Sequence, residues 1–246
     1  MLDGQIPELI KNKVVELAEF LKMPEEEVYR LAFQTNTESL VGEVWKEKNP
    51  QSQSERNLWY QETNQYLFNL IWFEYVKESQ VPLHASLANI CKQRNYKKVL
   101  DFGGGTGGTL LFISNEVPIE ANYYDLQGVG SEFAKFRVNK RGLQNFNFID
   151  SEDKVNDYAP YDFIICLDVL EHIENPPKYG AWLTSMLRKG GTMFLSAPFI
   201  ASGEHFPYPM HLEQNQKYGG SFGNYLESLG LKQDGSNLWY KPEITL

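Results

Sequence analysis

Cysteine, long apolar runs and an export signal are the features in which this sequence is poorest. Its two cysteines, Cys91 and Cys166, are too few for a disulfide framework. No apolar stretch approaches the roughly 18 residues that a membrane-spanning helix requires. The first residues, Met1–Gly4, lack the basic-then-apolar pattern of a signal peptide. These absences predict a soluble cytoplasmic protein that does not enter a membrane.

Basic residues are also scarce. The chain has 23 Lys and Arg against 32 Asp and Glu, a formal net charge of −9. A protein that grips a phosphate backbone over a broad face usually has the opposite sign. The anionic surface of a membrane is disfavoured for the same reason. The charge therefore predicts neither a nucleic acid nor a membrane surface as the partner.

What the sequence does have is size and aromatic residues. Its 246 residues suit one large α/β domain, or a domain of ordinary size with an appendage. Hydrophobic residues make up 42% and charged residues 22%, which excludes a disordered or low-complexity chain. Aromatic residues reach 14%, and such a surplus favours a large core, an apolar pocket, or both.

The chain up to about residue 95 has helical patterning throughout. Apolar spacing predicts helices over 7–22, from Pro24 onward, over 55–77 and over 82–94. The predicted helix over 55–77 is aromatic on more than one side, so we expect it to be buried or to cover something. A core helix and a lid over a substrate pocket are both compatible with this pattern. We predict that residues 1–95 form an N-terminal helical cap.

From residue 97 strands alternate with helices. The predicted strands are 97–101, 119–124, 146–149, 161–167 and 192–196, followed by an antiparallel pair, 231–233 and 238–240. The predicted helices are 106–114, 128–141, 176–188 and 215–229. Repeated β-α-β units imply a doubly wound, mostly parallel sheet of seven strands. We assign this sheet to a second domain, 96–246.

A glycine-rich turn follows the first predicted strand. Gly103, Gly105 and Gly108 satisfy the dinucleotide fingerprint G-x-G-x-x-G. Asp101, Gly103, Gly105 and Gly107 also satisfy the pattern acidic-x-G-x-G-x-G. Glycine at these positions lets a ligand approach the main chain closely.

The carboxylate of Asp101 separates the two patterns. Beside a pyrophosphate this carboxylate would be repelled, whereas a ligand with cationic groups would be attracted to it. S-adenosylmethionine (SAM) carries a sulfonium and an amino group and has no phosphate. The turn therefore favours SAM over a nicotinamide dinucleotide.

With these residues in order, the chain resembles the class I SAM-dependent methyltransferases over roughly residues 95–240. Asp125 ends the second strand, and Asp150 follows the third. The segments Asp168–Ile173 after the fourth strand and Leu187–Gly191 before the fifth are also similar to those of the family. The resemblance implies a Rossmann-like fold, a seven-stranded mostly parallel sheet with an N-terminal helical cap.

The resemblance also implies a cofactor site. Asp101, Gly103 and Gly105 would line the methionine part of SAM, and Asp168 would close the pocket near the transferred methyl group. On the nucleoside side, the resemblance implies that Asp125 binds the ribose hydroxyls and that Leu126 contacts the adenine. It also implies that Asp150 and Ser151 lie at the amino edge of the adenine.

Three histidines are the candidate catalytic residues. His172, His205 and His211 lie on segments that we expect to border the cleft, whereas His84 is expected to be structural or exposed. If the acceptor carries a proton, a base assists its removal, and one of the three could contact the acceptor or take that proton. His172 could instead be a hydrogen-bonded residue of a helix start.

A divalent metal is a further expectation. His205 and His211 lie six residues apart near oxygen donors and could bind iron or manganese. This loop resembles that of metal-assisted carbon methyltransferases of polyketide assembly. Asp168, Glu171 and His172 partly match a metal-binding pattern of quinone-pathway methyltransferases, which has a different first residue.

The sequence therefore predicts a SAM-dependent methyltransferase acting on a small organic acceptor, either free or attached to a carrier. Two alternatives stay open: an NAD-dependent oxidoreductase that uses the same glycines, and a SAM-binding module without catalytic activity. The identity of the acceptor, the methylated atom and the oligomeric state cannot be deduced from the sequence.

Overall fold

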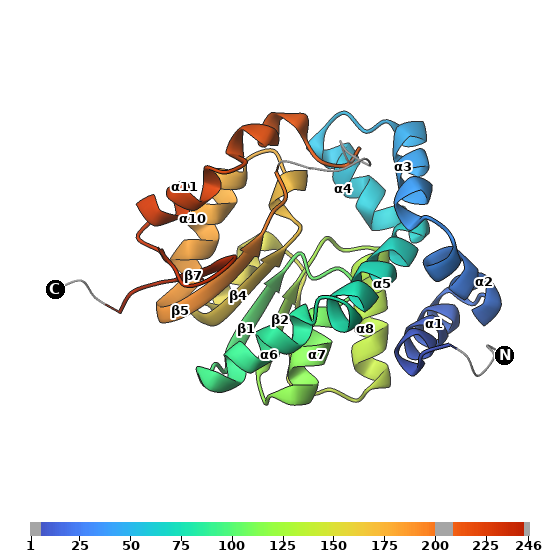
Figure 1. Cartoon of the computed structure of the whole chain (residues 1–246), viewed down its shortest axis with the longest axis horizontal. Helices are drawn as coiled ribbons and strands as arrows, with labels where there is room; N and C mark the ends of the chain where they lie inside the picture. The colour runs from blue at the N-terminus through green and yellow to red at the C-terminus, as the bar shows by residue number, and fades with distance from the viewer. Residues whose placement is uncertain (1–5, 200–208, 244–246) are drawn as a thin grey trace.

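The core of the protein is a sheet of seven strands with helices on both faces (Figure 1). The computed structural model describes residues 6–199 and 209–243. The strands are β1 (Lys98–Phe102), β2 (Glu120–Tyr124), β3 (Phe146–Ile149), β4 (Tyr161–Leu167), β5 (Leu187–Ser196), β6 (Lys232–Gln233) and β7 (Leu238–Tyr240). Strands β1 to β5 pair in parallel, and β7 pairs antiparallel with β5 and β6. The predicted mostly parallel sheet of seven strands is confirmed.

The strand order, β3-β2-β1-β4-β5-β7-β6, determines where a ligand can bind. The chain runs outward from β1 to β2 and β3, then returns to the other side of β1 as β4. In such sheets the crossovers leave a crevice outside the carboxyl ends of the strands, at the point where the order reverses. We therefore expect the site beyond the ends of β1, β2 and β4.

Two layers of helices bury the two faces of the sheet. One layer contains α6 (Leu83–Gln93), α7 (Gly108–Glu116) and α8 (Val129–Lys140), and its core includes Cys91, Leu110 and Phe163. The other layer contains α9 (Glu152–Val155), α10 (Pro176–Met186) and α11 (Phe222–Ser228). The continuous apolar run of β4 fits this arrangement, because both faces of the strand are covered.

The N-terminal helices lie beside this layered core and extend over the carboxyl ends of the strands (Figure 1). They are α1 (Glu8–Leu21), α2 (Glu25–Tyr29), η1 (Arg30–Gln34), α3 (Thr37–Lys48), α4 (Gln53–Glu62) and α5 (Asn64–Ser79). Leu17, Val28 and Ile71 form a core of their own with Phe133 of α8. A small cluster of Val41, Trp45, Trp59 and Met210 holds α3 and α4 against the chain after β5.

The predicted single helix over 55–77 is wrong, because the chain turns at Thr63. Thr63 has an extended conformation (φ −88°, ψ 98°) that separates α4 from α5. A capping box between Ser52 and Glu55 begins α4. Rings on the two sides of the break pack together, with 5.2 Å between the centroids of Tyr60 and Tyr66. The aromatic residues thus belong to two helices that run in different directions. Helical periodicity does not distinguish two such helices from one long helix.

The predicted helix over 215–229 is also divided. A 3-10 turn, η4 (Glu213–Tyr218), precedes α11, and Gly220 between them has a φ of +73°. The helix predicted from residue 106 begins only at Gly108, because the preceding glycines are not helical. Within the described ranges, no helix combines the length and apolarity needed to cross a membrane.

Candidate active site

A cavity of about 640 Å³ lies beyond the carboxyl ends of β1, β2 and β4. Its walls come from the glycine-rich turn, from the residues after β2 and β4, and from α4 and α5 of the N-terminal helices. The cavity therefore occupies the crevice that the strand order defines, with the helical segment as an additional wall.

The glycine-rich turn reaches the cavity in a conformation that side chains disfavour. Gly103 and Gly105 have φ angles of +76° and +53°. A Cβ atom on Gly103 would also lie 2.3 Å from a methyl carbon of Val169. A Cβ atom on Gly108 would lie 2.3 Å from the carboxylate of Glu74. Glycine is thus required for two reasons: the backbone conformation of the turn, and the close approach of neighbouring side chains.

Asp101 is a buried acid at the end of β1. Its Oδ2 atom has no hydrogen-bond partner in the part of the chain that the structure describes. Burial and the charge of Asp125 raise the pKa of Asp101 to about 7, against the opposing charge of Lys77. An unpartnered buried carboxylate at a cavity wall fits a ligand that supplies positive charge.

Asp125, after β2, organises the turn. Its Oδ2 atom accepts a hydrogen bond from the backbone N–H of Gly105 at 2.5 Å, and its Oδ1 atom accepts one from Leu126 at 2.6 Å. Tyr123 donates its hydroxyl hydrogen to the carbonyl of Gly105 at 2.6 Å. Burial raises the pKa of Asp125 to about 6. Leu126 lines the cavity beside it, as the resemblance implies.

The structure does not bring Asp150 and Ser151 to the cavity. The Asp150 carboxylate is 55% exposed and pairs with Lys154 at 2.7 Å, one helical turn further on. Glu152 is the acid of this segment that lines the cavity, and it accepts a hydrogen bond from Tyr179 at 2.8 Å. The adenine role expected for Asp150 and Ser151 stays a prediction, and Glu152 is the residue of this segment that reaches the cavity wall.

Asp168 lies where β4 ends, in a left-handed conformation with a φ of +56°. It accepts hydrogen bonds from Ser196 at 3.1 Å and from the Lys77 ammonium at 3.0 Å. Lys77 comes from α5 and also lies over the Phe73 ring. This ion pair joins the N-terminal helices to the turn after β4.

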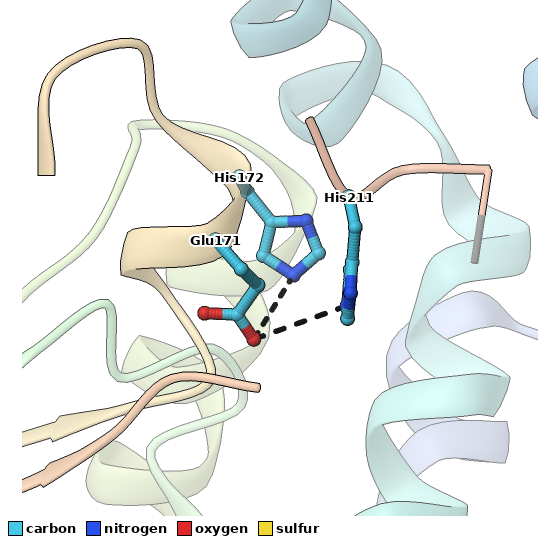
Figure 2. A group of neighbouring side chains, drawn as sticks. All are labelled: Glu171, His172 and His211. Atoms are coloured by element: carbon cyan, nitrogen blue, oxygen red, sulfur yellow. Dashed lines mark ion pairs between the residues drawn. The ribbon is translucent and has the colours of Figure 1, made fainter. Parts of the chain in front are cut away.

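Glu171, His172 and His211 meet at the cavity wall (Figure 2). Glu171 and His172 belong to η3 (Leu170–His172), and His211 follows β5. The Glu171 Oε1 atom is 3.7 Å from His172 Nε2 and 3.9 Å from His211 Nε2. Burial lowers the pKa of both histidines, that of His211 to about 4. Burial, together with Asp168, raises the pKa of Glu171 well above its usual range.

The other two histidines stand apart from this group. His84 is buried in α6, where its ring nitrogens lie 3.3 Å from the Thr109 hydroxyl and 3.4 Å from Glu78. Its expected structural role agrees with this packing. His205 lies outside the residues that the structure describes.

The residues that line the cavity and that the sequence analysis did not single out include Glu74, Lys77 and Glu152. Glu74 is buried and accepts a hydrogen bond from Thr106 of the glycine-rich turn at 2.7 Å. Burial opposes its ionisation, but Arg137 and Lys13 hold the pKa of Glu74 well below its usual value. Charged residues inside an otherwise aromatic helix were the available signal, because such side chains are rarely buried without partners.

The sheet order, with a cavity beyond the carboxyl ends of its strands, is that of the Rossmann-like class of folds. A family model described as a methyltransferase domain matches residues 72–232, more than half of the chain. The chain belongs to this methyltransferase family, which implies SAM as its cofactor. The match favours a methyltransferase over an NAD-dependent oxidoreductase.

A solved structure with a TM-score above 0.5 has the same fold. A protein of Methanococcus maripaludis assigned as a SAM-dependent methyltransferase matches with a TM-score of 0.51 and 14% identity, over 71% of this chain and 92% of that protein. A SAM-dependent methyltransferase from Clostridium acetobutylicum matches with a TM-score of 0.40 and 18% identity, over 51% of this chain. The match spans 55% of that second protein's length. No curated protein sequence matches the chain.

Proposed function

We propose that this enzyme transfers the methyl group of SAM to a small organic acceptor, free or attached to a carrier. The observation that carries the proposal is one cavity whose wall contains two different groups of residues. The glycine-rich turn and Asp101 line this cavity together with His172 and His211. In this proposal residues 1–95 act as the cap that encloses the acceptor.

The cofactor end fits SAM through charge and space. Asp101 would accept the positive charge of the methionine part, with Gly103 and Gly105 beside it. Asp125 would bind the ribose hydroxyls, and Leu126 would contact the adenine. These roles require Asp125 to exchange its hydrogen bond with Gly105 for bonds to the ligand.

The acceptor end would align the nucleophile and remove its proton. When bound, SAM supplies an activated methyl group on a positively charged sulfur. The side chains around the acceptor would mainly orient it for in-line attack and exclude water. Asp168, which also lines the cavity, would border the transferred methyl group.

His172 is held in a state suited to accept a proton. Its Nδ1 atom lies 3.0 Å from the carbonyl oxygen of Met210, which can only accept a hydrogen bond. The Tyr60 hydroxyl lies 3.2 Å from the same nitrogen and can either donate or accept a hydrogen bond. A hydrogen bond to the carbonyl requires the proton on Nδ1, and in that tautomer Nε2 is left as the acceptor. His211 faces it with 4.8 Å between ring centroids.

The partner class follows from charge and enclosure. A net charge of −9 disfavours nucleic acid and anionic membrane surfaces. Aromatic rings of α4 and α5, such as Tyr60, Tyr66 and Phe73, line the cavity and suit an organic acceptor.

A labelled-methyl assay tests this proposal. The full chain is incubated with methyl-labelled SAM and separate pools of phenols, enols, amines and thioester-linked acids, and S-adenosylhomocysteine formation is followed. We expect S-adenosylhomocysteine to form only when one of these pools is present. Failure of every pool, with SAM binding intact, would contradict a small organic acceptor.

His211 provides the catalytic test within this assay. We expect His211→Ala to lose most of its turnover while its SAM affinity, measured by calorimetric titration, stays within twofold of the parent. Such a split follows if the histidine acts on the acceptor and not on the cofactor. Retained turnover would remove His211 from the mechanism.

A further inference from the structure

The group of Glu171, His172 and His211 has a geometry that proton transfer does not require (Figure 2). One ligand atom from each side chain lies within 4.8 Å of the other two. The carboxylate oxygen is 3.7 Å and 3.9 Å from the two Nε2 atoms, which is too far for hydrogen bonds to them. Three donor atoms therefore surround a common point without bonding to one another.

Glu171 is the most unusual member of the group. It is only 1% exposed, and neither carboxylate oxygen has a hydrogen-bond partner among the described residues. A buried carboxylate without partners is costly unless it is neutralised by a proton or a cation. Figure 2 shows one oxygen of this carboxylate directed toward both imidazoles.

His172 has the orientation typical of a metal-binding histidine. The carbonyl of Met210 accepts the hydrogen bond of Nδ1, so the lone pair of Nε2 points toward the carboxylate. Metal-binding histidines usually donate the other ring N–H to a carbonyl or carboxylate in this way, which fixes the tautomer.

The two segments that supply the group are held together independently of any ligand. Asn215 donates to the carbonyls of Leu170, Glu171 and Ile173 at 3.3, 3.1 and 2.8 Å. The backbone N–H of Leu212 donates to the carbonyl of Glu171 at 3.0 Å. The turn after β4 and the residue next to His211 thus form one unit, so the three donors are positioned in advance.

We propose that Glu171, His172 and His211 bind a divalent first-row transition ion, with Zn²⁺ as the best fit. Two imidazoles and one carboxylate are a donor set of catalytic zinc sites that keep a further position open. Ligand atoms about 2.1 Å from the ion are about 3.5 Å apart, so small side-chain rotations close the group around it. Asp168 is not part of this group, and His205, the partner expected for His211, lies outside the described residues.

The open position would face the cavity and receive the acceptor. An ion there would lower the pKa of a bound hydroxyl, which then gives its proton to water before methyl transfer. The acceptor class is therefore a compound with an ionisable phenol or enol oxygen. This role in the reaction rests on the proposed function, whereas binding of the ion does not.

Zinc binding by the tag-free full chain tests the site directly. The protein is stripped with a chelator and titrated with Zn²⁺ in competition with a chromophoric chelator, without SAM. We expect one ion per chain, and at least tenfold weaker binding in Glu171→Gln and in His211→Ala. Glu174→Gln is the matched control, because Glu174 lines the same cavity three residues away and is 54% exposed. Its affinity should stay within twofold.

A second measurement does not depend on the folding of a variant. Co²⁺ added to the stripped parent protein should give the intense visible bands of a four-coordinate ion, and Zn²⁺ should remove them. Absence of stoichiometric binding, or binding unchanged in both variants of the group, would overturn the proposal. Thermal unfolding and SAM titration of each variant show that it is folded.

The methyl-transfer assay separates the two proposals. Stoichiometric zinc binding without turnover of any acceptor would contradict the proposed function and support the metal site. Turnover that needs His211 but is undiminished in stripped protein would overturn the role of the ion and favour the histidines as bases.

Discussion

Gly105 and Gly142 share a backbone conformation but have different surroundings. Their φ angles are +53° and +64°, and a Cβ atom on Gly142 would meet nothing within 4 Å. Gly105 lines the cavity at the end that we assign to SAM. Substitution of each by Val therefore compares the same backbone strain with and without an effect on the ligand space.

We expect Gly105→Val to abolish SAM binding, because its side chain would occupy the space in which the cofactor approaches the turn. Gly142→Val should bind SAM with unchanged affinity at a temperature where both variants are folded. Calorimetric titration measures both affinities. An equal loss in the two variants would assign the effect to strain and contradict the position of the cofactor.

Asp101 predicts a pH dependence of cofactor binding. Its folded pKa of about 7 lies above the value of about 3.8 expected in the unfolded chain. The folded protein therefore holds this proton more tightly, and its stability falls as pH rises from about 4 to about 7. A cationic ligand binds the ionised form, so SAM affinity should rise over the upper part of the same window.

The expected change is a roughly tenfold or greater gain in SAM affinity between pH 5.5 and pH 7.5. Asp101→Asn should bind more weakly and show a much smaller dependence on pH in that range. Titrations of both proteins at several pH values measure the effect. A parent protein whose affinity is independent of pH would contradict the charge pairing.

The positions of cavity residues were predictable where strand ends determined them. Asp101 is the last but one residue of β1, Asp125 and Asp168 directly follow β2 and β4, and parallel strands end at the same edge of a sheet. Asp150 directly follows β3 in the same way, yet its carboxylate is 55% exposed and pairs with Lys154. Sequence spacing identifies the end of a strand but not the direction of the next two residues.

At the scale of elements, α5 connects the N-terminal helices to the cavity. Its Lys77 forms the ion pair with Asp168 at 3.0 Å, and its Phe73 lines the cavity. The helix was expected from its apolar pattern, but its separation from α4 at Thr63 was not. Helical periodicity continues across a residue that simply changes the direction of the chain, so a single threonine gives little warning of such a turn.

Lys77→Met should weaken catalysis more than cofactor binding. The substitution keeps the length of the side chain but removes the charge that holds Asp168, and we expect a threefold to tenfold lower kcat, roughly the value of one partly exposed charged hydrogen bond. Lys178→Met is the control, because Lys178 also lines the cavity and lies over the Tyr179 ring. Steady-state kinetics with an identified acceptor should show a larger effect in the first variant. An equal decrease of kcat in the two variants would contradict a positioning role for Lys77.

At the scale of the whole molecule, buried ion pairs join the N-terminal helices to the sheet. Arg137 of α8 donates two hydrogen bonds of 2.8 Å to Glu74 of α5 and one of 2.8 Å to Glu16 of α1. Lys13 of α1 also contacts Glu74. Arg137 reaches the carbonyl of Thr106 at 3.0 Å, so the glycine-rich turn belongs to the same network.

We expect Glu74→Gln to lower the free energy of unfolding by about 3 kcal/mol or more, because two buried cations lose their shared counter-charge. Urea unfolding followed by circular dichroism measures the change. Arg30→Met is the control, since Arg30 pairs with Glu27 on the surface and its loss should leave the urea midpoint unchanged. Similar midpoints for both variants would show that the buried network contributes little.

The buried position of Arg137 has a consequence for any attempt to recombine this enzyme. Its guanidinium is only 2% exposed and takes both of its acidic partners from the first 95 residues. Exchanging those residues for a segment without these acids would leave the positive charge of Arg137 unpaired in the interior. A transplanted module must therefore bring two carboxylates to the same place, whatever new substrate it is chosen to recognise.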